Sequence, residues 1–165
     1  MLTRRTLLLA LAALPAACAA TGPTNTTRLI VLRHADRHAG NPELNATGVA
    51  RAAALPGAVA DLAIDAILIP DIDRNRVSAA PLAAARGLPV QVVAPVTIDT
   101  GGLARALLDA RPGGTVVWIG NTTNLITLWE ELDAPGDPPL GYGDIVLLDI
   151  RRGAVLRTGR RRVEA

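Results

Sequence analysis

The feature that most constrains the fold is a series of short apolar runs, each followed by a segment with the composition of a helix. Uninterrupted apolar runs are typical of strands buried on both faces of a parallel sheet, and intervening helices provide the crossovers that parallel strands need. The pattern therefore predicts a three-layer α/β/α fold with a mostly parallel central sheet. The expected strands are residues 29–32, 66–69, 90–93 and 115–119.

The segments between these runs have helical composition, and glycine or proline marks several of their ends. The expected helices are residues 47–63, with Pro56-Gly57 as a candidate break, 75–86 closed by Gly87, 102–110 closed by Pro112-Gly113-Gly114, and about 123–132. Two further apolar stretches, 145–150 and 154–157, predict a C-terminal β-hairpin around Arg152-Gly153. No internal repeat or low-complexity linker divides the chain, so we expect a single domain over residues 28–165.

The N-terminus has the pattern of an export signal. Residues 1–18 combine Arg4 and Arg5 with an apolar run over 7–14, too short to span a bilayer as a mature helix. The paired arginines also fit a twin-arginine signal. Residues 19–27 are polar and aperiodic, which predicts a flexible tether between the signal and the domain.

Cys18 is the only cysteine, so no intramolecular disulfide is possible. Its position after Ala16-Ala17 resembles a lipoprotein cleavage site, although Pro15 fits that pattern poorly. The sequence leaves open whether Cys18 becomes a lipidated N-terminus or the signal is simply cleaved. Either outcome predicts a bacterial envelope protein, periplasmic or anchored to a membrane by lipid.

Charge does not indicate a nucleic-acid partner. The chain has 17 basic residues, all of them arginine, and without Arg4 and Arg5 the remaining 15 balance the 15 acidic residues. The arginines that cluster near the C-terminus are interpreted as the solvated edge of the hairpin, because no aromatic residues interleave with them. No obligate protein partner is predicted either.

Polar residues follow three of the predicted strands: Arg33-His34, the segment 71–76, and 121–123. In open α/β sheets, ligands bind beyond the carboxyl ends of the strands. A neutral imidazole such as that of His34 is a competent nucleophile, and Arg33 and Arg74 carry planar donor forks suited to phosphate oxygens. The simpler interpretation is that Arg33 and His34 end a strand and pair with acids such as Asp36.

Four stretches carry a family resemblance: "VLRHADR", "PELNATGVARAAAL", "DIDRNRVSAAPLA" and "GGTVVWIGNTTNLI". In order and spacing they resemble the histidine phosphatase superfamily, the phosphoglycerate mutase-like group, and its small exported single-domain members in particular. The resemblance covers residues 28–157. It implies a phosphohistidine intermediate at His34, a phosphate clamp of Arg33 and Arg74, a phosphorylated small molecule or phosphate as ligand, and no metal or other cofactor.

The chain departs from the family pattern at several positions. A second histidine normally follows the fourth strand, where this chain has Asn121, which can donate a hydrogen bond but carries no charge. Pro70 and Asn75 replace a usual serine and threonine, and Ser78 stands where threonine is common. Asp36, His38, Asn75 and Thr122 are further candidate pocket residues. The general acid is left open among Asp36, Asp71, Asp73 and Asp99.

Other chemistries lack their residues. There is no G-x-S-x-G elbow and no lysine for a P-loop, and two histidines with one cysteine do not make a zinc site. The expected function is phosphomonoester hydrolysis through a phosphohistidine. The alternative is a catalytically degenerate protein that binds phosphate or a phosphorylated ligand, and a third interpretation is an envelope scaffold.

Overall fold

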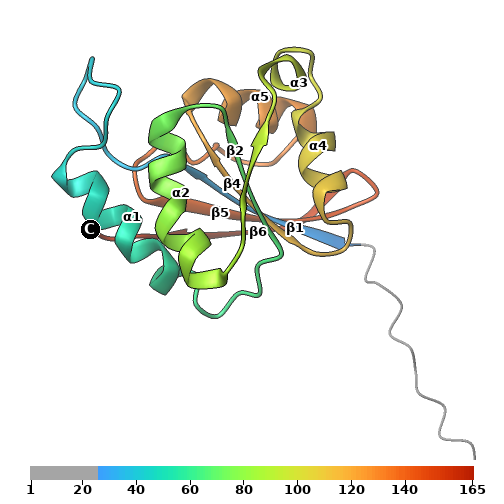
Figure 1. Ribbon diagram of the computed structural model, residues 1–165. Coiled ribbons are helices and arrows are strands. Elements are labelled where there is room, and N and C mark those ends of the chain that lie inside the picture. Colours follow the sequence, from blue (N-terminus) through green and yellow to red (C-terminus); the bar gives the residue numbers. More distant parts are fainter. Residues whose placement is uncertain (1–25) are drawn as a thin grey trace, which may run out of the picture.

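Six strands form one sheet in the computed structural model, which describes residues 26–165 (Figure 1). They are β1 (Thr26–Arg33), β2 (Ala66–Pro70), β3 (Val90–Val93), β4 (Thr115–Gly120), β5 (Asp144–Arg151) and β6 (Ala154–Arg162). Their order across the sheet is β3-β2-β4-β1-β5-β6. The first four pair in parallel, whereas β5 pairs antiparallel with β1 and β6. The predicted mostly parallel sheet with a C-terminal hairpin is confirmed.

Helices cover both faces of this sheet. They are α1 (Ala46–Ala58), α2 (Asp73–Arg86), α3 (Pro95–Asp99), α4 (Leu103–Ala110) and α5 (Thr122–Leu132). Buried residues of α1 and α2 belong to one hydrophobic cluster, and those of α4 and α5 belong to another on the opposite face (Figure 1). The fold is therefore the predicted α/β/α sandwich.

The pleat of β1 explains why its residues 29–32 are all apolar. Leu29 and Val31 pack in the α4–α5 cluster, whereas Ile30 and Leu32 pack in the α1–α2 cluster. Alternate side chains of a strand point to opposite faces, so a strand covered on both faces needs no polar alternation. All four side chains are nearly or fully buried, which stabilises the fold by about 1.5–3 kcal/mol for each residue of this size.

Several predicted boundaries need correction. The segment 19–27 was expected to be a tether, but Thr26 and Thr27 already pair with β5, because their backbone groups complete the ladder. The helix expected over 47–63 ends at Ala58, since Pro56-Gly57 lie in its last turn and shorten it rather than break it. The short helix α3 was not predicted, and β6 extends to Arg162 because its pairing with β5 continues as far as Asp144.

The predicted signal peptide, Cys18 and most of the tether lie outside the described residues and stay predictions. Within residues 26–165, no helix is both long enough and apolar enough to cross a membrane.

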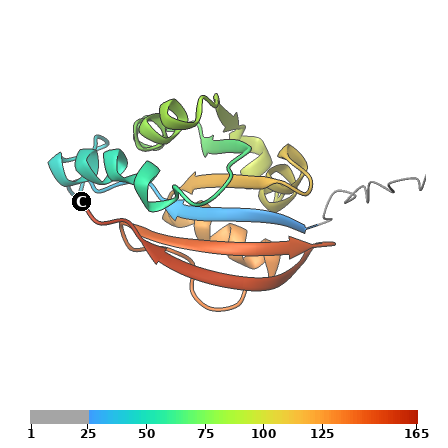
Figure 2. The same ribbon diagram turned by 90° about the horizontal axis from the view of Figure 1, so that it is seen from below.

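The arginine-rich hairpin forms an edge of the sheet, where β5 and β6 lie side by side (Figure 2). Arg161 forms a two-bonded ion pair with Asp61, at 2.5 and 2.8 Å, and Arg162 pairs with Asp144. These contacts show that part of the basic cluster is paired with carboxylates of the same domain.

Two glycines of α1 provide a matched test of how closely this helix packs. A Cβ at Gly48 would lie 2.1 Å from the carbonyl oxygen of Asp36, in the loop that follows His34, whereas a Cβ at Gly57 would meet nothing within 4 Å. We expect Gly48→Ala to lower the free energy of unfolding by about 1–3 kcal/mol because the loop backbone must shift. Gly57→Ala should raise it by about 0.5–1 kcal/mol, because alanine loses less conformational entropy in a helix.

Urea unfolding of the two variants beside the parent measures both changes. If Gly48→Ala were as stable as the parent, the close approach of α1 to this loop would be wrong.

Candidate active site

Three strand ends converge on one small cavity, as the sequence predicts. The cavity has a volume of about 230 Å³ and lies beyond the carboxyl ends of β1 and β4, beside the first turn of α2. It brings together the predicted residues Arg33, His34, Arg74, Asn121 and Thr122, and adds Arg37 and Thr123. No carboxylate lines this cavity among the described residues, so its lining has a strong positive charge.

The three arginines of the cavity carry unused hydrogen-bonding capacity. The Nε atoms of Arg33, Arg37 and Arg74 are all buried, and none has a hydrogen-bond partner among the described residues. A buried donor without a partner costs free energy, more so when it is charged. Burial, together with the nearby charges of Arg37 and Arg33, also lowers the pKa of Arg74. An anion with several acceptor oxygens is the ligand that this arrangement favours.

Neutral groups rather than carboxylates hold two of these arginines. Arg33 donates from Nη1 to the carbonyl of Leu140 at 2.9 Å, and its guanidinium lies 4.4 Å from the centre of the Tyr142 ring. Arg37 donates to the carbonyls of His38 and Asn41 at 3.2 and 3.0 Å. The side chains are therefore oriented while their positive charges stay available to a ligand.

His34 is buried, with 1% of its surface exposed. Its Nδ1 lies 2.8 Å from the carbonyl oxygen of Ala35, and because a carbonyl only accepts, Nδ1 carries the proton and Nε2 carries the lone pair. Burial, opposed by this hydrogen bond and reinforced by the charges of Arg74, Arg33 and Arg37, lowers the pKa of His34 to about 4. The imidazole is therefore neutral at pH 7, the form in which Nε2 can act as a nucleophile.

Two buried polar side chains tie the strand ends to one another. Ser78 accepts the backbone N–H of Ala35 at 2.9 Å and donates to the carbonyl of Arg74 at 2.7 Å. Asn75 donates to the carbonyl of Ile119, in β4, at 2.8 Å. These bonds fix the positions of His34, Arg74 and the end of β4 relative to each other.

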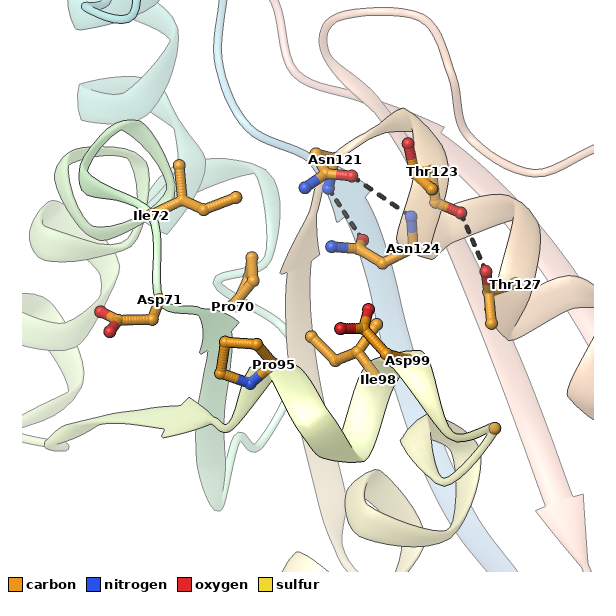
Figure 3. A pocket seen from close by; sticks show the side chains of 11 residues that line it. Pro70, Asp71, Ile72, Pro95, Ile98, Asp99, Asn121, Thr123, Asn124 and Thr127 are labelled. Carbon is orange, nitrogen blue, oxygen red and sulfur yellow. Dashed lines mark hydrogen bonds between the residues drawn. The ribbon is translucent and has the colours of Figure 1, made fainter.

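Asn121 has two roles at the start of α5. Its side-chain oxygen accepts the backbone N–H of Asn124 at 3.2 Å, while the Asn124 side chain accepts the N–H of Asn121 at 2.9 Å (Figure 3). This reciprocal capping box leaves the Asn121 amide NH₂ without a partner among residues 26–165, on the wall of the cavity. The helix N-terminus adds a partial positive charge beside it.

Three of the predicted pocket residues do not line this cavity. Asp36 forms a 2.6 Å ion pair with Arg51, and although burial alone would raise the pKa of this carboxyl, Arg51 lowers it. His38 is exposed on the loop after β1, and Asn75 points into the protein, towards β4. The sequence offered all three as pocket residues because they follow the strand ends, but it could not give the direction of their side chains.

A second cavity, of about 550 Å³, adjoins the first, and Asn121 and Thr123 line both (Figure 3). Of the four carboxylates considered as general acids, Asp71 and Asp99 line this second cavity and Asp36 and Asp73 do not. Among the described residues there is no group of three or more His, Cys, Asp or Glu side chains that could hold a metal ion.

Sequence reasoning missed two contributors to the site, Arg37 and Tyr142, and named Thr123 only as part of the polar segment 121–123. Arg37 lies within the same short motif as His34, so its spacing was a usable signal. Tyr142 stacks on Arg33 and its ring lies 5.8 Å from that of His34, but it comes from a proline-rich loop with no predictive pattern.

Comparison with known proteins adds a family and a fold. The sequence model of the histidine phosphatase superfamily (branch 1) matches residues 29–96, which span most of β1 and all of α1, β2, α2 and β3. No curated protein matches the sequence.

Solved structures resemble the chain over most of its length. The native mycobacterial glucosyl-3-phosphoglycerate phosphatase is 18% identical, with a TM-score of 0.61 over 84% of this chain and 98% of that one. The protein histidine phosphatase SixA complexed with tungstate is 16% identical, with a TM-score of 0.59 over 82% and 96%. A phosphoglycerate mutase from Bacillus anthracis is 15% identical, with a TM-score of 0.61 over 86% and 94%.

The low pKa of His34 gives a direct test of the site. In phosphate-free buffer, the imidazole Cε1–H resonance of His34 should titrate with a midpoint near pH 4, against an ordinary value of 6.5. NMR measures this midpoint, and loss of the resonance in His34→Gln assigns it. In the unfolded state His34 has its ordinary pKa of 6.5, so as the pH falls it is protonated before the folded state is. The stability that depends on neutral His34 is therefore complete above about pH 6.5 and is lost as the pH falls to about 4.

His34→Gln should remove most of this pH dependence between those limits, as followed by urea unfolding at each pH. A midpoint at pH 6 or above would contradict the buried, arginine-surrounded environment described for His34.

Proposed function

We propose that this chain is a member of the histidine phosphatase superfamily and hydrolyses phosphomonoesters through a phosphohistidine at His34. One observation carries the proposal: three arginines with unpartnered buried Nε atoms surround a buried neutral histidine whose Nδ1 is fixed by a backbone carbonyl. That arrangement supplies a nucleophile and a set of charged donors within one cavity. Two of the similar solved structures are phosphatases, and one of them, SixA, binds tungstate, in agreement with this chemistry.

In the first step, the lone pair of His34 Nε2 attacks phosphorus. The bond from phosphorus to the ester oxygen breaks, and the alcohol or phenol leaves with its electron pair and takes a proton from solvent or from an acid. Arg33 and Arg74 hold the phosphoryl oxygens as charge develops on them. The Nδ1 proton stays on its nitrogen, held by the Ala35 carbonyl, and stabilises the phosphorylated ring.

In the second step, a water oxygen attacks the same phosphorus atom. The bond between phosphorus and Nε2 breaks, the imidazole regains its lone pair, and the water releases one proton to solvent. The net reaction converts a phosphomonoester and water to an alcohol and inorganic phosphate. The neutral ground state of His34 lets the cycle start at neutral pH.

Arg37 compensates for the charge that Asn121 cannot provide. The family resemblance implies a second histidine at position 121, where this chain has a neutral amide. Arg37 lines the same cavity as Asn121 and has a buried, unpartnered Nε atom among the described residues. The number of cationic donors is therefore sufficient for phosphoryl transfer without the second imidazole.

A second candidate function is binding of phosphate or a phosphorylated ligand without turnover. The observation that favours it is the capping box, because the oxygen of Asn121 is committed to the backbone of α5 and only its NH₂ group faces the cavity. An amide neither carries charge nor exchanges a proton at pH 7.

Phosphate release from an aryl phosphate tests the first proposal, because an aryl oxide is a good leaving group and needs little help from an acid. We expect the purified protein to release phosphate between acid and neutral pH, and His34→Ala to lower kcat by at least about 10²-fold. If the parent binds phosphate but shows no release above the His34→Ala background, the second candidate function replaces the first.

Two substitutions at one position separate capping from catalysis. Asn121→Asp keeps the oxygen that accepts the Asn124 N–H but places a negative charge on the cavity, so phosphate binding should weaken while stability is retained. Asn121→His should cost about 1 kcal/mol of stability because histidine is a poor cap, while leaving phosphate binding intact. A gain of activity in Asn121→His from an inert parent would identify a retired phosphatase.

The contribution of Arg37 has its own test. We expect Arg37→Gln to lower kcat/KM for the aryl phosphate by about 10²-fold, since one charged donor to the transferring group is lost. Arg105→Gln is the matched control, because Arg105 is exposed on α4 and pairs only with Asp109. Equal activity of Arg37→Gln and the control would remove Arg37 from the site.

A further inference from the structure

The larger cavity beside the phosphate pocket differs from it in character. It has a volume of about 550 Å³, in the range of small-molecule sites. Four apolar side chains form part of its wall, namely Pro70, Ile72, Pro95 and Ile98. Because Asn121 and Thr123 line both cavities, a phosphoryl group held by the arginines places its organic part here.

The charges of the two cavities are opposite. The smaller cavity is lined by three arginines and no carboxylate, whereas the larger is lined by Asp71 and Asp99 and by no basic side chain among the described residues. Asp71 is already paired with Arg76, at 3.1 Å, and its carboxylate points away from Asn121 in Figure 3. The Asp99 carboxylate points to the side of the cavity where Asn121 and Asn124 lie (Figure 3).

Asp99 is thus a negative charge without an ionic partner. It forms no ion pair within residues 26–165 and lies on α3, a short helix set directly after β3. The side chain of Asp99 is exposed to solvent, and no basic side chain among the described residues lines this cavity, so the carboxylate is open to a cation that enters it. The site is therefore complementary to a molecule with a phosphate at one end and a positive charge at the other.

We propose that the larger cavity selects phosphomonoesters whose organic part is a short aliphatic chain bearing an amine or quaternary ammonium group, with Asp99 as the carboxylate that binds this cation. The inference rests on the proposed function, because the phosphoryl group must occupy the arginine cavity for the organic part to reach Asp99. Apolar side chains contact the aliphatic chain, and the two threonines of the cavity, Thr123 and Thr127, border it on α5.

Binding of phosphonates tests this without requiring turnover, since their carbon–phosphorus bond is not hydrolysed. Isothermal titration calorimetry compares 3-aminopropylphosphonate with propylphosphonate, which has the same chain without the positive charge. The 2-aminoethyl and 4-aminobutyl compounds vary the distance between the phosphonate and the amine. We expect the best aminophosphonate to bind the parent about three- to tenfold more tightly than its uncharged counterpart. High salt should reduce this preference.

Three variants assign the preference to its residue. Asp99→Asn should bring the ratio of the two affinities close to one while leaving the affinity for propylphosphonate unchanged. Asp71→Asn should reduce the ratio only slightly, because Asp71 is paired with Arg76. Asp109→Asn, an exposed acid on α4, should not change it.

The outcomes separate this inference from the function on which it rests. Equal affinities of the two phosphonates for the parent, or an unchanged ratio in Asp99→Asn, would overturn the inference even if phosphate binds and aryl phosphate is hydrolysed. A loss of kcat in Asp99→Asn with an unchanged ratio would instead identify Asp99 as the proton donor. Failure of inorganic phosphate and both phosphonates to bind would overturn the proposed function, and the inference with it.

Discussion

The whole site depends on a concentration of positive charge that the protein does not neutralise. Three guanidinium groups gather around His34, and two of them are held by backbone carbonyls and an aromatic ring instead of carboxylates. Like charges held together destabilise the fold, so the surrounding structure must supply the free energy to keep them in place. Burial is the main cause that lowers the pKa of His34, and the same charges add to it. Burial and positive charge together thus keep the histidine neutral and favour the binding of an anion.

Rigid links between strand ends allow this arrangement. Ser78 joins the loop after β1 to the first turn of α2, and Asn75 joins that turn to β4. The loop after His34 is also anchored through Asp36, whose carboxylate pairs with Arg51, while Arg51 also donates to the carbonyl of Val163 near the C-terminus. Each link is a hydrogen bond or an ion pair between buried or half-buried groups. Because such bonds are directional, they fix the relative positions of the strand ends more strictly than apolar packing does. Asp36 and Asn75, which the sequence offered as pocket residues, therefore hold the site in place and do not line it.

The sequence predicted correctly those features that follow from a single structural rule. The strand at 29–32 could be predicted because a doubly covered strand is apolar throughout, and the meeting of Arg33, Arg74 and Asn121 followed from the parallel sheet. It failed where direction depends on tertiary partners, as for Asn75, which points towards β4. Tyr142 could not be found because its position follows from the path of a loop without periodicity.

Asn121 combines the capping of a helix with a place on the wall of the arginine-lined cavity. Asparagine is among the best residues to begin a helix, and here its oxygen and the Asn124 side chain close a reciprocal capping box. Histidine at this position would bring charge to the cavity but leave backbone donors of α5 without that partner. Because Arg37 already brings charge to the same cavity, the amide is compatible with phosphate binding. The stability of α5 matters in turn, since this helix also forms a wall of the larger cavity. The cap that orders the wall of the arginine-lined cavity therefore orders the wall of the larger one as well.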